Sequence, residues 1–342
     1  MRINRVVAQA AMATLALALV TPPIYASEGN KQQQAIGLFS RAYKLTNIWA
    51  KGSPGFVMDA QATIYGRAGT SEAGSYRLIW KSDGESVTDI EFPDYHSITV
   101  NHAGKTWSSS TSVYLPYPVF QLKRIADPLL SLMLLRSEKL KKISNRKIGG
   151  TPAVCPSFAE QKTHGLHEYC FAQATGYLIQ ENDPKWLTTF EFGDYAPFGG
   201  KVFPRNLRVV QSGQLIVDAK VTSIASDPKM DAAALVVPPG VQPSPIPHCS
   251  EDQPEHVKAI FQPAPHYPSH GLINRITGTV VIYADIGKDG IPRGLTVLAS
   301  PGPGFSQSAL ASVGQWRYQP PACNGIPMEA FSAIEVHYTM RE

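Results

Sequence analysis

The chain has 342 residues, of which 43% are apolar and 17% are charged, values that exclude a disordered protein and predict two globular domains. The formal net charge is +4, and Arg2 and Arg5 lie in a segment that we expect to be removed. The 29 basic and 27 acidic residues that remain give no basic stripe, which excludes nucleic acid as a partner.

Residues 1–26 have the pattern of a signal peptide. Two arginines precede an apolar run over 6–20, which is too short for a membrane span, and Ala26 is a small residue suited to cleavage. The Pro22-Pro23 pair also favours cleavage, which would leave the mature chain in the periplasm. The alternative is an uncleaved N-terminal helix that anchors the chain in the inner membrane.

Four cysteines in an exported chain predict disulfides. Cys155 and Cys170 fall in what the pattern indicates is one hairpin, and Cys249 and Cys323 fall in or beside the C-terminal domain. We therefore predict the pairs Cys155–Cys170 and Cys249–Cys323. The alternative is free, buried thiols.

Residues 27–235 have the pattern of a helix followed by a long antiparallel meander. Helical spacing of apolar residues predicts a helix over 35–45 and a second one over 119–136, broken at Asp127-Pro128. Short β-rich segments between turn residues predict strands at 56–65, 75–80, 85–92, 96–100, 148–154, 167–172, 177–180, 186–195, 204–211 and 215–225. Gln211-Ser-Gly213 is expected to form a tight hairpin turn.

A long meander with helices must bury one face, so we expect an antiparallel sheet curved into a half-barrel with the helices on its concave face. This order resembles the LolA-type lipoprotein-carrier fold over about residues 27–227. The phrases that carry the resemblance are Tyr76–Trp80, Ile90–Tyr95, Gly104–Trp107, Thr175–Leu178 and Phe203–Arg205.

Seven aromatic residues of this domain have two interpretations. They fill the core, or some of them line an apolar cavity for acyl chains, as the resemblance to lipoprotein carriers implies. They are Trp80, Tyr95, Trp107, Phe120, Trp186, Phe190 and Tyr195.

Residues 236–255 are rich in proline and predict a short, semi-rigid linker. Residues 256–342 predict a small ββαβ domain, with a short helix leading into it over 256–261. Its expected elements are strands at 278–286 and 295–300 around a turn at 287–290, a helix over 305–313 capped by Ser306, and a closing strand at 331–339. This order, and the Trp316-x-Tyr318-x-Pro320 phrase, resemble the TonB C-terminal domain.

The TonB resemblance implies a periplasmic, non-enzymatic domain that binds partner peptides by adding them as a strand beside its last strand. The residues that match this strand are Ala333, Ile334, Glu335, Val336, His337 and Tyr338. The family's partner-contacting segment is matched by Pro265, Tyr267 and Pro268, although Ala264 stands where the family has Gln. These three residues alternatively only fix the start of the domain.

The sequence predicts no catalytic residue, no metal site and no cofactor. His164, His167 and Glu168 lack the helical spacing of zinc proteases, and we interpret them as a solvated loop. The expected partner is a protein, such as a TonB-dependent outer-membrane receptor or another envelope protein. The alternative function is a carrier whose lipid or lipoprotein cargo lies in the half-barrel.

Overall fold

The architecture comes from a computed structural model, which describes residues 28–49, 52–66, 70–82, 85–129, 139–159, 165–227, 235–237, 239–241, 244–245, 257–323 and 325–340. The predicted signal peptide and Cys249 lie outside these ranges. Within them, no helix combines the length and the apolar character needed to cross a membrane.

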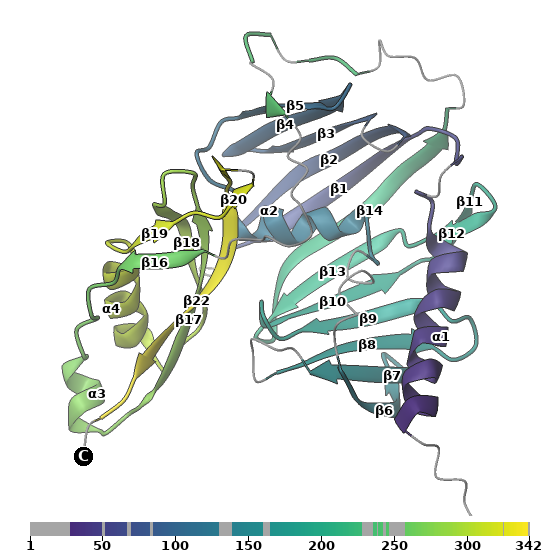
Figure 1. The fold of residues 1–342 in the computed structure, drawn as a ribbon. Helices are drawn as coiled ribbons and strands as arrows, with labels where there is room; N and C mark the ends of the chain where they lie inside the picture. The colour runs from purple at the N-terminus through teal and green to yellow at the C-terminus, as the bar shows by residue number, and fades with distance from the viewer. Residues whose placement is uncertain are drawn as a thin grey trace, which may run out of the picture.

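The N-terminal part is built on one sheet of 13 strands in the order β15-β5-β4-β3-β2-β1-β14-β13-β10-β9-β8-β7-β6, in which all neighbours are antiparallel (Figure 1). The strands are β1 (Phe56–Tyr65), β2 (Ser71–Ser82), β3 (Glu85–Phe92), β4 (Tyr95–His102), β5 (Lys105–Ser110), β6 (Lys139–Ile148), β7 (Thr151–Ala159), β8 (Leu166–Ala172), β9 (Leu178–Asp183), β10 (Thr188–Gly193), β13 (Asn206–Gln211), β14 (Gln214–Ser226) and β15 (Ser244–Pro245). The hairpin β11 (Ala196–Phe198) and β12 (Lys201–Phe203) forms a separate ribbon.

The inner face of this sheet is covered by helices, as the alternation of the strands requires. Along β1, Phe56, Met58, Ala60 and Ala62 are buried on this face. The helix α1 (Glu28–Thr46) packs Phe39 against the rings of β7 and β8, and α2 (Tyr117–Leu122) with the 3-10 turn η1 (Lys123–Ile125) lies further along the same face. The predicted half-barrel with helices on its concave face is confirmed.

Some element boundaries differ from the predictions. The expected strand 148–154 is instead the junction of β6 and β7, because Gly149 and Gly150 adopt positive φ angles of 52° and 85° and turn the chain back. The helix predicted over 119–136 ends at Ile125, before the Asp127-Pro128 pair, and residues 130–138 lie outside the described ranges. The Gln211–Gly213 turn forms as predicted, with φ of 48° at Ser212 and 80° at Gly213.

The C-terminal part has its own core around a three-stranded sheet in the order β18-β17-β22. Its elements are β16 (Lys258–Phe261), α3 (Ser269–Ile273), β17 (Gly278–Ile286), β18 (Pro292–Ala299), α4 (Pro303–Val313), β19 (Arg317–Gln319), β20 (Ala322–Cys323), β21 (Ile326–Pro327) and β22 (Ala330–Tyr338). The predicted ββαβ order is confirmed, because β17, β18, α4 and β22 follow one another along the chain apart from short strands.

Two local predictions in this domain are wrong. The expected helix over 256–261 is the strand β16, which pairs with β19; the pairing satisfies backbone groups that an isolated short helix would leave free. Ser306 does not cap α4, since the helix already begins at Pro303. The Ser306 hydroxyl instead donates to the Gly302 carbonyl over 3.3 Å.

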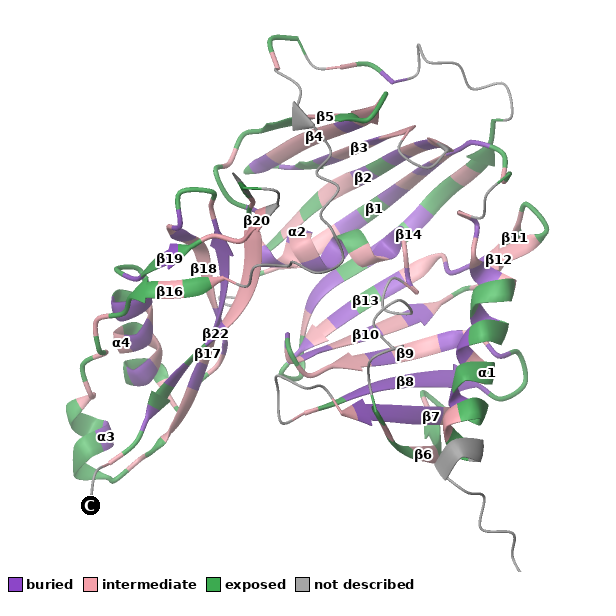
Figure 2. Ribbon diagram, viewed as in Figure 1, coloured by how far each residue is buried: buried purple, intermediate pink, exposed green. Residues whose placement is uncertain are grey.

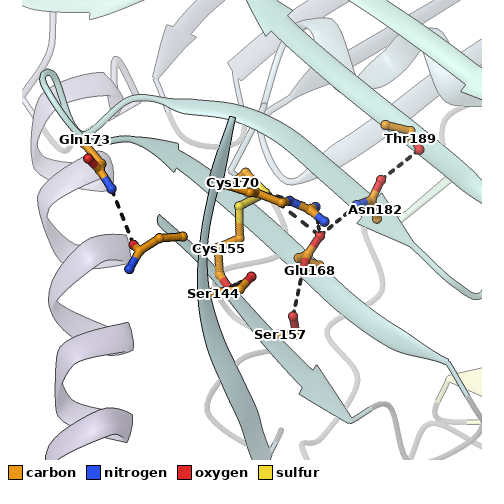
Figure 3. Close-up of a disulfide and its surroundings, with 10 residues drawn as sticks. Ser144, Cys155, Ser157, Glu168, Cys170, Gln173, Asn182 and Thr189 are labelled. Atoms are coloured by element: carbon orange, nitrogen blue, oxygen red, sulfur yellow. Dashed lines mark hydrogen bonds and ion pairs between the residues drawn. A yellow bond between two sulfur atoms is a disulfide. The ribbon is translucent and has the colours of Figure 1, made fainter. Parts of the chain in front are cut away.

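The predicted disulfide Cys155–Cys170 is confirmed and joins the hairpin β7–β8 (Figure 3). Both cysteines are fully buried on the outer face of the sheet, beside Ile148 and Ile179. Next to them, the Glu168 carboxylate pairs with Arg146 and accepts hydrogen bonds from Ser157 and Asn182, each over 3.0 Å. The other predicted pair, Cys249–Cys323, is not tested, because Cys249 lies outside the described residues.

Candidate peptide-binding edge and domain interface

The strand β22 is an edge of the C-terminal sheet. Within the described residues it pairs with β17 alone, in nine consecutive antiparallel pairs from Gly278↔Tyr338 to Ile286↔Ala330, without a bulge. Its side chains alternate as predicted: Ile334, Val336 and Tyr338 are buried toward α4, whereas Glu335 and His337 are exposed on the opposite face. Ala333 lies on that opposite face too, and it is partly buried.

Three polar side chains lie together on the exposed face of β22 and β17. The imidazole of His337 lies 2.9 Å from the hydroxyl of Thr279 on β17, and 3.4 Å from the carboxylate of Glu335. All three side chains are accessible to water, so their mutual attraction is weak.

The Pro265–Pro268 segment is held on the α4 side of the domain. The Tyr267 ring packs edge-on against Phe305 at 5.7 Å and against Tyr338 at 5.5 Å, and its hydroxyl donates to the Ile276 carbonyl over 2.5 Å. The structure thus brings Tyr267 together with the last residue of β22. Tyr267 fixes the start of the domain, and Pro265 and Pro268 beside it are partly buried.

The opposite face of the C-terminal sheet docks on the half-barrel (Figure 1). Tyr283 of β17 is fully buried there, and its ring centroid lies 4.9 Å from that of Tyr117, 5.8 Å from that of Phe120 and 5.9 Å from that of Trp186. Phe331 of β22 adds a contact with Phe120 at 4.9 Å. The two domains therefore share an aromatic interface.

Hydrogen bonds to the backbone of Leu115 fix this interface. The Leu115 N–H donates to the Asp285 carboxylate over 2.9 Å, and the Leu115 carbonyl accepts from the Tyr283 hydroxyl over 2.9 Å. A third bond runs from the Ser212 hydroxyl to the Leu298 carbonyl over 3.2 Å. The interface is largely apolar, but the polar groups at its centre are hydrogen-bonded. These bonds fix the position of one domain on the other.

Asp285 is the one charged residue buried in the C-terminal core regions that the structure describes. Its burial raises the pKa of the carboxyl, and the nearby Glu329 adds to the rise. The Leu115 N–H, Arg293 and Lys123 oppose it by favouring the carboxylate. Docking of the two domains therefore destabilises the ionised form of Asp285 relative to the protonated form.

The interpretation of His164, His167 and Glu168 as a solvated loop is wrong for the last two residues. They lie in β8 and are buried, because consecutive side chains of this strand face the inner and outer cores. The His167 imidazole is 2.9 Å from the Glu181 carboxylate, which also pairs with Arg124. His164 lies outside the described residues.

His167, Glu181 and Asp183 place possible metal-ligand atoms within 4.8 Å of one another. The guanidinium of Arg124 already supplies a positive charge at Glu181, and its Cζ lies 5.1 Å from the centroid of the Phe190 ring. Arg124, Glu181 and His167 form a buried ion-pair network that holds η1 on the inner face of the sheet, whereas Asp183 accepts a hydrogen bond from the Lys185 N–H over 2.9 Å.

The seven aromatic residues of the half-barrel are packed rather than exposed. Trp80, Tyr95, Trp186 and Phe190 are buried in the inner core, and Phe120 and Tyr195 are partly buried against it. Figure 2 shows that buried and partly buried residues make up most of the strands β7, β8, β9 and β10. Trp107 is different, since it packs on the outer face with a small cluster around Val87 and Val100.

The interface residues Tyr283, Phe331 and Leu115 were not predicted from the sequence. A signal for Tyr283 exists: residues 279–286 form a nearly continuous apolar run, a pattern typical of strands buried on both faces. A C-terminal sheet covered by α4 alone would show polar residues at alternate positions of β17.

Comparison with known proteins gives a family for the C-terminal domain. Residues 263–340 match the family model of the Gram-negative bacterial TonB protein C-terminal. No curated protein has a sequence that matches this chain.

Solved structures similar to the chain have low sequence identity. A domain described as an outer membrane lipoprotein-sorting protein from Vibrio parahaemolyticus is 12% identical, with 60% of this chain and 95% of that chain covered and a TM-score of 0.39. A DUF1329 family protein from Desulfovibrio piger is 12% identical, with 59% and 96% covered and a TM-score of 0.41. A LolA superfamily protein from Nitrosomonas europaea is 9% identical, with 59% and 97% covered and a TM-score of 0.39.

The family match covers β17, β18, α4 and β22, together with the Tyr267 segment that leads into them. Residues 263–340 of this chain thus form a domain of the TonB C-terminal type, and it is docked on the curved antiparallel half-barrel.

Proposed function

We propose that the chain is an exported, non-enzymatic interaction protein of the periplasm, which binds an extended peptide of a protein partner as an added strand on β22. The observation that carries the proposal is the position of β22 at the edge of its sheet, paired with β17 only in the described part of the chain. An edge strand presents a row of backbone donors and acceptors that a peptide can satisfy.

The two edges of this sheet differ in a way that favours β22. Proteins protect exposed edges with proline, lysine and bulges. The opposite edge strand, β18, begins at Pro292, contains Gly294 and has register shifts against β17. In contrast, β22 has neither proline nor lysine, and its register against β17 is regular throughout. The unprotected edge is the one that matches the partner-binding strand of the TonB family.

The family resemblance suggests the class of partner. A TonB-type domain at the end of an exported chain fits a TonB-dependent outer-membrane receptor or another envelope protein. Glu335 and His337 are exposed polar side chains on one face of β22, so selectivity would come from alternate side chains of the peptide. The segment with Pro265, Tyr267 and Pro268 is the second part of the proposed site, and Tyr267 packs against Tyr338 of β22.

A second candidate function is a carrier of lipid or lipoprotein. The LolA-like form of the N-terminal domain favours it, together with an inner face that is rich in aromatic residues. The two functions are compatible, because they use different domains.

Strand addition is tested by backbone substitution. Proline removes an N–H donor and blocks pairing, so Glu335→Pro or His337→Pro is expected to abolish peptide binding in calorimetric titrations. The matched variants Glu335→Ala and His337→Ala keep the backbone and should weaken binding only modestly. The peptides are TonB-box-like sequences, and circular dichroism shows whether the proline variants remain folded.

Equal loss with alanine would indicate recognition through side chains. If the wild-type chain binds none of these peptides, the transport role is excluded and the carrier function takes its place.

A further inference from the structure

The helix α1 exposes two large apolar side chains that lie outside the core of the half-barrel. Ile36 is 47% exposed and Tyr43 is 49% exposed. They are seven residues apart, which is close to two turns of a helix, so they lie on one stripe of its surface. A different stripe, with Ala35, Phe39 and Ala42, is buried and holds the helix on the sheet. The apolar pair is therefore available to a partner.

A pocket of about 440 Å³ lies beside the C-terminal end of α1, between the helix and the hairpin β11–β12. Among the described residues that line it, three are cationic and none is acidic. The lining residues are Arg41, Lys44, Leu45, Gly200, Lys201 and Val202. The ammonium group of Lys201 donates to the Lys44 carbonyl over 2.8 Å, which holds the hairpin against the helix.

The three cations of this pocket have no acidic partner in the part of the chain that the structure describes. The lysine and arginine side chains that form ion pairs there are Arg77, Arg124, Arg146, Arg208 and Arg293. Arg41 instead donates to the Thr175 carbonyl over 3.3 Å, in the turn between β8 and β9. A Cβ at Gly176 would lie 2.7 Å from the Arg41 Nε, so glycine leaves room for this side chain. The pocket therefore has an uncompensated positive charge, which attracts anions.

Around α1, Lys44 lies between the pocket and the apolar pair. It follows Tyr43 directly, and Arg41 is three residues before it, so the three side chains occupy neighbouring positions on the helix. We define Ile36, Arg41, Tyr43, Lys44 and Lys201 as the α1 surface. Figure 1 shows α1 on the side of the half-barrel away from the C-terminal domain, and Figure 2 shows exposed residues along the helix.

We propose that the α1 surface docks the protein on a lipid bilayer that contains anionic phospholipid, with a headgroup phosphate in the pocket. The phosphates of such a bilayer complement the three cations, and the acyl boundary directly beneath them accepts the apolar pair. Tyrosine, lysine and arginine suit this boundary because each has an apolar body and a polar end. The docking goes beyond the proposed function, since it uses neither β22 nor the inner face of the half-barrel.

An acidic peptide matches the α1 surface less completely than a bilayer does. The backbone groups within a helix are already hydrogen-bonded, so a peptide cannot be added to α1 as a strand and would be held by side chains alone. Its carboxylates would pair with the cations and leave the apolar pair unused. A bilayer offers anionic and apolar groups together, and we therefore assign the surface to it.

Docking through α1 leaves the other proposed site accessible. The C-terminal domain and its edge strand β22 lie on the far side of the half-barrel from α1 (Figure 1), so a docked chain can still bind a peptide. Two half-exposed apolar side chains and three cations give reversible binding at the bilayer surface rather than insertion. The electrostatic part of this binding is weakened by salt.

The test measures co-sedimentation of the full-length mature chain with vesicles of two compositions. One is an equimolar mixture of phosphatidylglycerol and phosphatidylcholine, and the other is phosphatidylcholine alone. Arg41→Gln/Lys44→Gln removes two exposed cations, and glutamine forms helix about as well as arginine and lysine do. The matched control Lys258→Gln/Lys288→Gln removes the same charge from exposed positions of the C-terminal domain. Circular dichroism shows whether each variant is folded.

The wild-type chain is expected to bind the mixed vesicles and not the phosphatidylcholine vesicles. Arg41→Gln/Lys44→Gln should bind the mixed vesicles at least about tenfold more weakly, because each basic residue near an anionic surface contributes roughly fivefold. The control should bind as wild type does. Equal loss in both variants would assign binding to overall charge and overturn the α1 surface. Equal binding of wild type to both vesicles would overturn the role of the cations.

The apolar pair distinguishes a bilayer from an acidic polypeptide. Ile36→Ser/Tyr43→Ser should also weaken binding to the mixed vesicles, whereas Val113→Ser/Ile260→Ser, which changes exposed apolar residues elsewhere, should not. If the α1 variant binds as wild type does, the surface recognises charge alone. The assignment to a bilayer is then overturned in favour of an acidic partner.

A measurement on the wild-type chain keeps the test decisive if a variant does not fold. Rising salt must release the wild-type protein from the mixed vesicles, because salt screens the attraction between exposed cations and phosphates. Binding that does not change with salt, or no binding at low salt, contradicts the proposal. Peptide binding at β22 is measured without vesicles, so either proposal can fail while the other holds.

Discussion

The hydroxyl of Tyr283 in the C-terminal domain donates to the carbonyl of Leu115 in the half-barrel over 2.9 Å, across a separation of 168 residues. Asp285, on the same strand β17, accepts a hydrogen bond from the Leu115 N–H. One residue of the half-barrel thus has both of its backbone polar groups satisfied by the other domain. Substitution of Tyr283, or a change in the charge of Asp285, should therefore alter the docking of the two domains before it alters the packing of either core.

Docking should strengthen as the pH falls. The pKa of Asp285 is raised in the docked state by burial, so this state binds a proton more tightly than the undocked one. Docking is therefore strongest below the ordinary aspartate pKa of about 4, and it weakens as the pH rises through the raised pKa. The radius of gyration, measured by small-angle scattering between pH 4 and pH 8, should increase over this range.

The variant Asp285→Asn separates the effect of this carboxyl group from the effects of Lys123, Arg293 and Glu329, whose charges act on it. Asparagine keeps an oxygen that can accept the Leu115 N–H but carries no charge. The variant should stay docked at pH 8 and lose most of the pH dependence. A dependence equal to that of wild type would assign the effect to other groups.

Trp316 should be a major contributor to the stability of the C-terminal domain. It is 8% exposed, and its indole N–H donates to the Pro263 carbonyl and to the Ser312 hydroxyl, each over 3.1 Å. Trp316→Ala is expected to cost about 3–5 kcal/mol of the free energy of unfolding. Thermal denaturation followed by circular dichroism measures it, with the exposed neighbour Gln315→Ala as control. An unchanged melting temperature would show that the indole does not hold the core.

Tyr267 should act through packing more than through its hydroxyl. Tyr267→Phe removes only the bond to the Ile276 carbonyl and should cost about 1 kcal/mol. Tyr267→Ala also removes the contacts with Phe305 and Tyr338 and should cost several times more. Urea denaturation of both variants gives the two values. If Tyr267→Phe loses peptide binding without losing stability, the hydroxyl contacts the partner directly.

Intact-mass analysis should show a processed and oxidised chain. Protein exported to the periplasm is expected to begin at about Ser27, and its four cysteines should resist alkylation until a reductant is added. The loop closed by Cys155 and Cys170 has a sequence separation of 15, and in the chain-entropy model such a disulfide contributes about 3 kcal/mol. A retained N-terminus, or alkylation of Cys155 without reductant, would contradict this.

Local patterns predicted the elements well where alternation and turn residues agree. The strands over 56–65, 85–92 and 278–286 match the structure residue for residue, and Cys155–Cys170 followed from placing both cysteines in one hairpin. The predicted alternation of Ile334 and Glu335 on the closing strand is also confirmed.

The sequence pattern did not show which surfaces meet across long separations. The seating of Tyr283 on Tyr117 depends on the relative position of two domains, and the apolar run around Tyr283 fits any partner that covers its face. His167 was misjudged for a related reason. Its ion pair with Glu181 lies between two strands, and the local polarity of residues 164–168 indicated a loop instead.

The pairing of β1 with β14 sets an order on folding. Phe56 lies opposite Ser226, so the central ladder of the large sheet joins residues near the two ends of the half-barrel. A chain that emerges N-terminus first exposes one edge of β1 until β14 has followed it. Such distant pairings fold slowly and expose unpaired strands meanwhile. Folding of this protein should therefore depend on factors that shield nascent strands.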